Sequence, residues 1–219
     1  MTIDADAVAS VLTRHLPVYR MRRPVYQVVM LQALAQIWKP SYRRVLDIGG
    51  GTGVIAQAVS ELFDVDRVVS VDVADRFLPT LTIEHRTYDG RRLPFEAGDF
   101  DCVMFNNVIH HVETTDRAPL LLDCRRVAKN GDLLIKDHVA VGSLDHARLA
   151  VLDVVGNTIF SGMIRASYLT DADWRRLAAE TGFVMEHATS GPYRSSFYAT
   201  LFPNRLETTM RWAAAGSAG

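Results

Sequence analysis

The chain has 219 residues, enough for one substantial hydrophobic core but few for two. Its 48% hydrophobic and 22% charged residues are ordinary for a folded globular domain, which argues against disordered and fibrous proteins. The 24 basic residues are balanced by 25 acidic ones. Because proteins that bind duplex nucleic acid usually carry a basic excess, we do not expect nucleic acid as a partner.

The N-terminal residues and the two cysteines indicate the compartment. Residues 1–9 contain Asp4 and Asp6 and lack the apolar stretch of a signal peptide, and no apolar run approaches the ~20 residues that span a bilayer. Cys102 and Cys124 lie within apolar runs without metal-like spacing, which favours reduced core cysteines. We therefore expect a cytoplasmic protein with no membrane contact and no bound metal.

Two kinds of hydrophobic pattern alternate along most of the chain. The first 44 residues show helical spacing of apolar side chains, with Pro24 near a helix start and Pro40 after its end. Beyond them, five strand-like segments are separated by connecting segments, most of them helical, which predicts βαβ units and a parallel sheet. Two further strand-like segments follow each other directly and predict an antiparallel final hairpin. The predicted strands are 44–48, 67–72, 82–88, 100–106, 132–137, 183–189 and 196–202, and the later helices are 54–63, 117–128, 146–155 and 171–180.

A glycine-rich segment joins the first strand to the next helix. Asp47 lies on the strand, and Gly49, Gly51 and Gly53 follow it. Glycine allows a tight turn and a close approach of a ligand to the backbone, and the free N–H groups of the following helix favour a phosphate or carboxylate. The stretch 51–56 reads GTGVIA and also satisfies the relaxed dinucleotide pattern G-x-G-x-x-A, so a nicotinamide cofactor is an alternative.

Three further segments accompany the glycines. Asp72 closes the second strand about 20 positions later, where an acidic residue can bind ribose hydroxyls. The segments YDGRRLPFEAGDFD (88–101) and VMFNNVIHHV (103–112) follow. Together these motifs resemble the class I S-adenosylmethionine-dependent methyltransferases, in which the first of the two segments reads G-D-A-x-x-L-P-F-x-D-x-S-F-D. Among the departures from that pattern are Tyr88 and Gly90, where the family usually has glycine and alanine.

The resemblance implies a fold, a cofactor and the residues that bind it. The implied fold is α/β, a Rossmann-like three-layer sandwich with a mostly parallel seven-stranded sheet and an antiparallel C-terminal hairpin. The family's cofactor is S-adenosyl-L-methionine. Its glycines pack against the amino acid half, acidic residues organise the amino group, the ribose and the adenine, and backbone after the fourth strand faces the methionine part. The positions that match are Asp47, Gly49, Gly51, Gly53, Asp72, Val73, Asp89, Gly90, Asn106 and Asn107.

We expect a single methyltransferase domain over residues 1–219. It divides into an N-terminal helical cap (1–44), a cofactor-binding half (45–138), a lid (139–168) and a C-terminal helix with its hairpin (169–212). The small-residue tail from Ala213 to Gly219 is expected to fray.

His138, His110 and Asp137 are the candidate catalytic residues. The fifth strand ends in Asp137-His138, at the edge where ligands bind in open α/β sheets. His138 can act as a base near neutral pH, with Asp137 orienting it or contacting the substrate. A hydrogen bond from His138 to the following loop is the structural alternative. His110 lies in a segment that resembles the family's L-H-H sequence and is the second candidate base.

The acceptor side carries no family motif. Residues 139–168 are long for a strand-to-helix connection and predict a lid, with Arg148, Asn157, Arg165 and Tyr168 as polar candidates for its inner face. Residues 19–23, with the sequence YRMRR, are a candidate for the opposite side and for holding an anionic acceptor. A solvated helix face is the favoured interpretation of these basic residues.

The leading hypothesis is an S-adenosylmethionine-dependent methyltransferase that methylates a small molecule at oxygen, with a homodimer left open. Nucleic-acid amino-methyltransferases have an N-P-P-Y-like turn after the fourth strand, where this chain has Asn106-Asn107, which disfavours that class. A metal-dependent catechol-type enzyme is disfavoured because His138 occupies a position where that family tends to have asparagine. A protein methyltransferase and an NAD-dependent oxidoreductase remain alternatives. So does a non-catalytic cofactor-binding protein, which the intact glycines, Asp72 and Asp89 disfavour.

Overall fold

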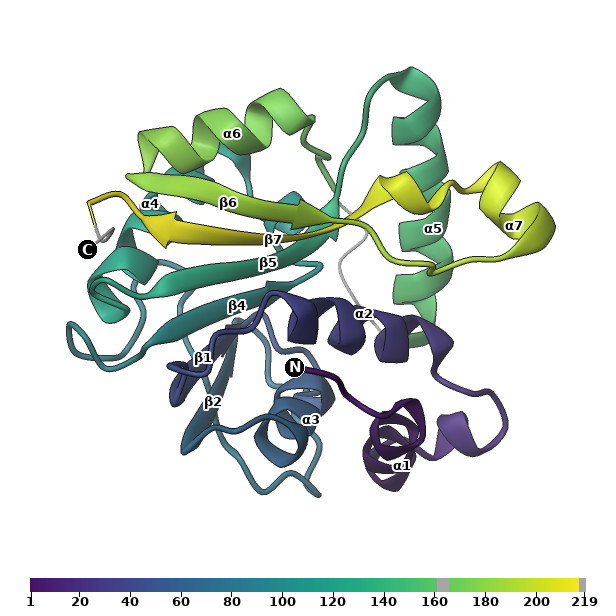
Figure 1. Cartoon of the computed structure of the whole chain (residues 1–219), viewed down its shortest axis with the longest axis horizontal. Helices are drawn as coiled ribbons and strands as arrows, with labels where there is room; N and C mark the ends of the chain where they lie inside the picture. Colours follow the sequence, from purple (N-terminus) through teal and green to yellow (C-terminus); the bar gives the residue numbers. More distant parts are fainter. Residues whose placement is uncertain (161–165, 217–219) are drawn as a thin grey trace.

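Seven strands form one mixed sheet in the order β3-β2-β1-β4-β5-β7-β6 (Figure 1). We describe residues 1–160 and 166–216 of a computed structural model, with backbone alone for residues 153 and 155–160. The first five strands are parallel, and β7 runs antiparallel between β5 and β6. The strands are β1 Arg44–Ile48, β2 Arg67–Asp72, β3 Glu84–Thr87, β4 Cys102–Asn106, β5 Asp132–His138, β6 Phe183–Thr189 and β7 Glu207–Ala214. The predicted α/β fold with a mostly parallel seven-stranded sheet is confirmed.

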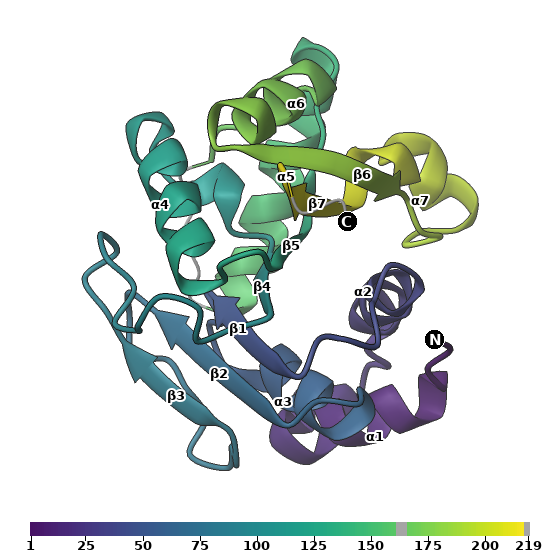
Figure 2. The same ribbon diagram turned by 60° about the vertical axis from the view of Figure 1, so that its left-hand side comes forward.

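Helices cover both faces of this sheet, so the fold has three layers (Figure 2). One core joins α1, α2 and α3 to one face, and the other joins α4 and α6 to the opposite face. The α-helices are α1 Ala5–His15, α2 Val25–Gln36, α3 Val54–Leu62, α4 Thr114–Val127, α5 Ser143–Phe160, α6 Asp171–Glu180 and α7 Ser196–Leu201. Short 3-10 helices occur at η1 Pro17–Arg20, η2 Ile109–His111 and η3 Asn204–Leu206.

The central strands are apolar on both faces, which is the reason they pair as parallel strands beneath helices. Successive side chains of a strand point to opposite faces. On β1, Val45 belongs to the core with α1 to α3, whereas Leu46 belongs to the core with α4 and α6. Because the strands are parallel, their carboxyl ends meet at one edge, which brings together the segments that follow β1, β2, β4 and β5.

The predicted final hairpin is wrong in its second strand. Residues 196–201 form helix α7, and the strand that pairs with β6 is β7, further along the chain. The apolar side chains that suggested a strand are exposed, with Phe197 at 72% and Tyr198 at 69%. In contrast, β7 begins with Glu207, which is fully buried and forms an ion pair with Lys136. A buried charge at the strand start hides the hydrophobic pattern on which the prediction relied.

Two boundaries also differ from expectation. The C-terminal tail does not fray at Ala213 and Ala214, which are buried in β7. Helix α5 continues past the predicted end at residue 155 to Phe160 and, with α7, lies beyond the right-hand end of the sheet in Figure 1. Across residues 1–160 and 166–216, none of the helices is long and apolar enough to cross a membrane.

Candidate active site

A cavity of about 420 Å³ opens at the carboxyl edge of the parallel strands. The glycine segment after β1, the end of β2 and the turn after β4 form one side of its wall, while η1 and α2 form the other. This cavity brings together seven of the predicted cofactor residues, namely Gly49, Gly51, Asp72, Val73, Gly90, Asn106 and Asn107. It does not bring Asp47, Gly53 or Asp89 to its wall.

The backbone of the glycine segment explains why glycine is needed there. Gly49, Gly51 and Gly53 have φ angles of +72°, +58° and +76°, which residues with a side chain rarely adopt. A Cβ on Gly51 would have no atom within 4 Å, so this residue faces the open space of the cavity. A Cβ on Gly49 would lie 2.6 Å from Val108, and one on Gly53 would lie 2.5 Å from Leu81. These two glycines therefore pack against protein.

Asp72 ends β2 with its carboxylate at the wall of the cavity. One carboxylate oxygen accepts a hydrogen bond from the backbone N–H of Gly51 (2.8 Å), and the other accepts one from Ala74 (3.0 Å). The guanidinium of Arg76 donates to both oxygens at 3.3 Å. These bonds fix the glycine segment to β2. A carboxylate with several acceptor sites beside the cavity fits the ribose hydroxyls of a nucleoside.

Asp47 lies behind the glycine segment and is buried. Its carboxylate accepts hydrogen bonds from the Ser70 hydroxyl (2.8 Å) and the Asn106 amide (3.3 Å). Burial raises the pKa of Asp47 to about 7, although both hydrogen bonds act in the opposite direction. A Cβ on Gly50 would lie 2.6 Å from this carboxylate, so Asp47 is separated from the cavity by one backbone segment.

Asp89 is exposed and caps a turn. Its carboxylate accepts hydrogen bonds from the backbone N–H groups of Arg91 (2.9 Å) and Arg92 (3.2 Å), which lower its pKa. The neighbouring Gly90 lines the cavity with a φ of +76°. Contact between Asp89 and an adenine amino group therefore stays a prediction, whereas Gly90 already lies at the wall.

Side chains of the N-terminal cap form a wall that the motifs did not predict. The sequence singled out Tyr19, which does line the cavity, while the basic residues of segment 19–23 are exposed. The other cap residues at the cavity are Leu16, Tyr26, Gln27 and Met30. Their apolar helical spacing is the same as that of ordinary core residues, so the sequence alone carried no signal for this role.

Asp137 and His110 form a buried pair at the end of β5. The two side chains are fully buried, and His110 Nδ1 hydrogen-bonds to Asp137 Oδ1. The same carboxylate accepts backbone N–H groups from Ile109 (2.9 Å) and His138 (2.7 Å). Burial favours a raised pKa for Asp137, but the His110 imidazole and these hydrogen bonds outweigh it and hold the pKa well below its ordinary value.

The other two histidines have different surroundings. His138 Nδ1 lies 3.1 Å from Glu207 Oε2, and the buried His138 side chain does not line the cavity. His111 does line the cavity, and its ring centroid is 4.0 Å from that of His110. Sequence reasoning singled out His110 of this pair. The structure places His110 against Asp137, whereas His111 lies on the cavity wall.

The predicted lid residues that are described do not reach this cavity. Tyr168 is buried, with its ring centroid 5.6 Å from that of His110. Arg148 forms an ion pair within α5. Arg165 and the side chain of Asn157 lie outside the described residues. A lid over the acceptor stays a prediction.

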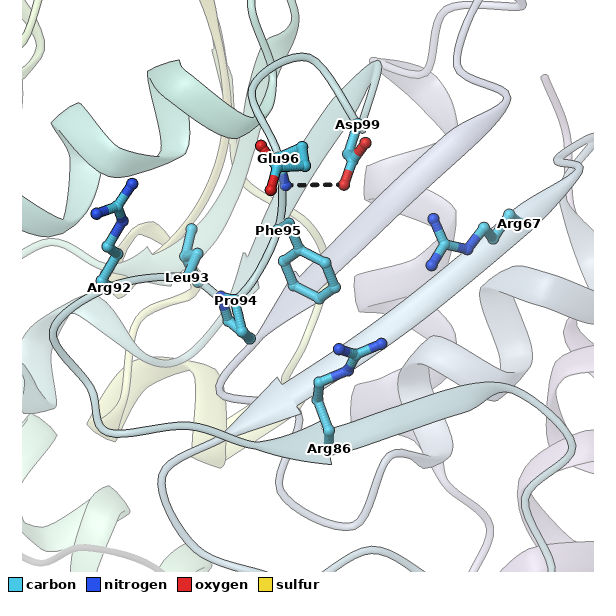
Figure 3. Close-up of a pocket in the computed structure, with 8 residues that line it drawn as sticks. All are labelled: Arg67, Arg86, Arg92, Leu93, Pro94, Phe95, Glu96 and Asp99. Atoms are coloured by element: carbon cyan, nitrogen blue, oxygen red, sulfur yellow. Dashed lines mark hydrogen bonds between the residues drawn. The ribbon is translucent and has the colours of Figure 1, made fainter.

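A second hollow, of about 480 Å³, lies near β3 and contains none of the predicted site residues. Figure 3 shows Arg86 reaching from β3 toward Phe95, and its guanidinium carbon lies 5.0 Å from the ring centroid. Arg67 and Arg86 both form ion pairs with Glu84, so this one carboxylate offsets part of their positive charge. The cavity at the carboxyl edge is therefore the candidate site.

The fold and the central motifs agree with known methyltransferases. Structures with the same fold include a chain of the complex between the Haloferax volcanii Trm112 methyltransferase activator and a methyltransferase (TM-score 0.69, 14% identity, 98% of this chain and 99% of that one). Another is the S-adenosylmethionine-dependent methyltransferase from Mesorhizobium loti (TM-score 0.61, 14% identity, 83% and 95%). In sequence, residues 46–135 match the family model described as a methyltransferase domain.

Curated relatives are similar over part of their length. The chain is 34% identical over 101 residues to a ubiquinone biosynthesis O-methyltransferase of Roseobacter denitrificans, which covers 42% of this chain and 39% of the relative. It is 22% identical over 150 residues to a flavonoid 4′-O-methyltransferase of Glycine max, covering 64% and 40%. The chain thus spans about two fifths of the length of these relatives.

The match over residues 46–135 agrees with the resemblance to class I S-adenosylmethionine-dependent methyltransferases that the motifs predict. This match supports the enzyme class and the S-adenosylmethionine cofactor expected from the sequence. The acceptor is a separate question, which the cavity and its surroundings address.

Proposed function

We propose that the protein transfers the methyl group of S-adenosylmethionine to an oxygen of a small-molecule acceptor. The observation that carries the proposal is the cavity at the carboxyl edge, which combines Gly51, Asp72 and the Asn106–Asn107 turn with His111 on the same wall. The open space in front of Gly51 fits a cofactor that approaches the backbone closely. When bound, the cofactor supplies an activated methyl group.

Each of the cavity residues has a role that fits this cofactor. Asp72 offers its carboxylate to the ribose hydroxyls, and the N-terminus of α3 behind the glycine segment favours the carboxylate of the amino acid half. Asp47 lies one backbone segment away from the cavity. Its carboxylate therefore influences the ammonium group of the cofactor indirectly and not by direct contact. The Asn106–Asn107 turn lines the cavity together with residues of the N-terminal cap. We assign this part of the cavity to the acceptor.

An O-directed reaction needs a group that takes the acceptor's proton. We place this general base at His110, which lies behind the cavity wall against His111, rather than at His138. The ionised Asp137 accepts a hydrogen bond from the Nδ1–H of His110, which leaves Nε2 as the basic nitrogen and stabilises the imidazolium that forms. His111, on the cavity wall beside it, contacts the acceptor. His138 is engaged instead by Glu207.

The cap side chains and the relatives both favour an apolar, flat acceptor. Leu16, Tyr19, Tyr26 and Met30 present apolar or aromatic surface to the cavity. Three curated relatives are named as flavonoid, strychnine and ubiquinone-biosynthesis O-methyltransferases, which favours a hydroxyl on a small molecule, whereas a fourth is named as a protein-L-isoaspartate O-methyltransferase. A protein or nucleic-acid acceptor would need an extended docking surface in place of this enclosed wall.

The test is transfer of isotopically labelled methyl from S-adenosylmethionine to a panel of phenols and hydroxylated quinone precursors. With the best acceptor, His110→Ala should lose about 10²–10⁴ in turnover, the usual loss for a general base, while binding S-adenosylhomocysteine normally. His138→Ala is the matched histidine control and should keep most turnover if it folds. If His138→Ala loses turnover and His110→Ala does not, the base is His138. If label enters only proteins or RNA of a lysate, the proposed acceptor class is wrong.

A further inference from the structure

A lysine near the end of β5 is buried without access to water. Lys136 and its partner Glu207 on β7 both have side chains with 0% exposure. Lys136 shares a sheet face with Leu134, which belongs to the core formed with helix α2. A buried ammonium group is costly unless hydrogen bonds and an opposite charge compensate it, so its partners show what it does.

The ammonium group of Lys136 has a partner for each of its three donors. It donates to Glu207 Oε2, to the Tyr26 hydroxyl on α2, and to Asn107 Oδ1 (2.6 Å) on the turn after β4. The ring centroids of Tyr26 and Tyr193 lie 4.7 and 5.3 Å from Nζ, close enough for cation–π attraction. The lysine therefore links two strands, a turn and a helix at one point.

The Tyr26 hydroxyl is fully engaged by this network. It accepts hydrogen bonds from Lys136 and from the Asn107 amide (3.2 Å), and it donates to Glu207 Oε2 (3.0 Å). Burial, followed by the charge of Glu207, raises the pKa of Tyr26 well above its ordinary value, so the phenol keeps its proton. Tyr26 consequently presents its ring to the cavity, and its position there is set by the lysine.

Asn107 is the second cavity residue that Lys136 holds. Its φ of +58° lies in the left-handed region, which asparagine adopts more readily than other residues with a side chain but less freely than glycine. Its backbone N–H donates to the carbonyl of Lys136 (2.8 Å), and its side chain bonds to the Lys136 ammonium and the Tyr26 hydroxyl. The lysine thus stabilises the strained turn that faces the cofactor cavity.

We propose that Lys136 is a positioning residue of the active site, fixing the Asn107 turn and the Tyr26 ring at the cavity so that helix α2 closes one wall in a defined geometry. The proposal rests on the proposed function, since it takes the cavity to be the S-adenosylmethionine site. Lys136 touches neither cofactor nor acceptor. It acts through Asn107 and Tyr26, which line the cavity.

The test is a calorimetric titration with S-adenosylhomocysteine at a temperature well below unfolding. Lys136→Met should bind it at least tenfold more weakly than the unmodified protein. Tyr26→Phe, which removes only the hydroxyl, should also weaken binding. The double variant should bind no more weakly than Lys136→Met alone, because both changes break the same link. Asn107→Gly added to Lys136→Met should restore part of the affinity, since glycine adopts a positive φ without strain.

Lys39→Met is the matched control. Lys39 forms an ion pair with the buried Asp132 (2.6 Å) at the opposite end of the same strand, away from the cavity. It should lose stability but bind S-adenosylhomocysteine as tightly as the unmodified protein. A purely structural role for Lys136 would give the same result in both lysine variants.

The outcomes separate the two proposals. If folded Lys136→Met binds S-adenosylhomocysteine with unchanged affinity, the positioning role is refuted. If Lys136→Met does not fold, Tyr26→Phe decides the matter, and unchanged affinity in that variant refutes the role. If the unmodified protein itself does not bind S-adenosylhomocysteine, the proposed function fails first, and that failure is visible without any variant.

Discussion

Substitution of two neighbouring glycines by alanine should affect different properties: mainly cofactor affinity at Gly51 and mainly stability at Gly50. Gly51→Ala places a methyl group in open space, because no atom lies within 4 Å of the new Cβ. Its cost to stability is the left-handed backbone at φ +58°, about 1–2 kcal/mol. The methyl group projects into the cavity, however, where overpacking costs about 1–3 kcal/mol of binding. Affinity for S-adenosylhomocysteine should therefore fall roughly tenfold or more in a protein that remains folded.

Gly50→Ala is the contrasting variant. Its Cβ would lie 1.9 Å from the Ser70 hydroxyl and 2.6 Å from the Asp47 carboxylate, both of which are buried. Moving Ser70 away breaks its hydrogen bond to Asp47 as well as straining the core, so the loss in unfolding free energy should reach about 3–5 kcal/mol. Urea unfolding and titration calorimetry measure the two effects. Normal S-adenosylhomocysteine affinity in Gly51→Ala would refute the assignment of the glycine segment to the cofactor.

Three other changes give separate tests. Asp72→Asn should weaken S-adenosylhomocysteine binding about tenfold or more through loss of charge-assisted hydrogen bonds, whereas Asp75→Asn, an exposed neighbour, should not; equal calorimetric affinities would place the ribose elsewhere. Because the pKa of Asp47 is raised to about 7, its neutral form stabilises the fold at low pH, and this contribution is lost as the pH rises from about 4 through 7. The ammonium group of S-adenosylhomocysteine favours the ionised form of Asp47. As the pH is raised toward 7, affinity should therefore increase by up to about tenfold per pH unit. This pH dependence should vanish in Asp47→Asn. Thr170→Ala removes the capping box at the start of α6 and should cost about 1 kcal/mol of unfolding free energy, while Thr170→Ser should retain most of it.

The cofactor side of the site was predictable because its chemistry depends on residue type at fixed spacing. A positive φ beside an open cavity favours glycine at position 51, and the short acidic side chain of Asp72 at the strand end accepts a hydrogen bond from the backbone N–H of Gly51. The parallel strands then bring such segments to one edge whatever the rest of the chain does. This is why the predicted fold is confirmed, and why the glycine segment and the Asn106–Asn107 turn line the same cavity.

The Lys136 network and strand β7 could not be predicted, because both depend on contacts between residues far apart in the sequence. Lys136, Glu207 and Tyr26 come from three separate parts of the chain, and nothing in their local sequences indicates that they meet. Glu207 also disguised β7, since a charged residue at a strand start reads as surface until its buried partner is known. Phe197 had the opposite effect: its apolar side chain suggested a buried strand at residues 196–202, but it is exposed on helix α7.

The most direct test of the account is a pair of calorimetric titrations of the unmodified protein, one with S-adenosylhomocysteine and one with NAD. The account predicts saturable binding of S-adenosylhomocysteine and no binding of NAD, since residues 46–135 match the methyltransferase domain model and Gly51 and Asp72 of that stretch line the cavity. Saturable binding of NAD without binding of S-adenosylhomocysteine would contradict the central claim.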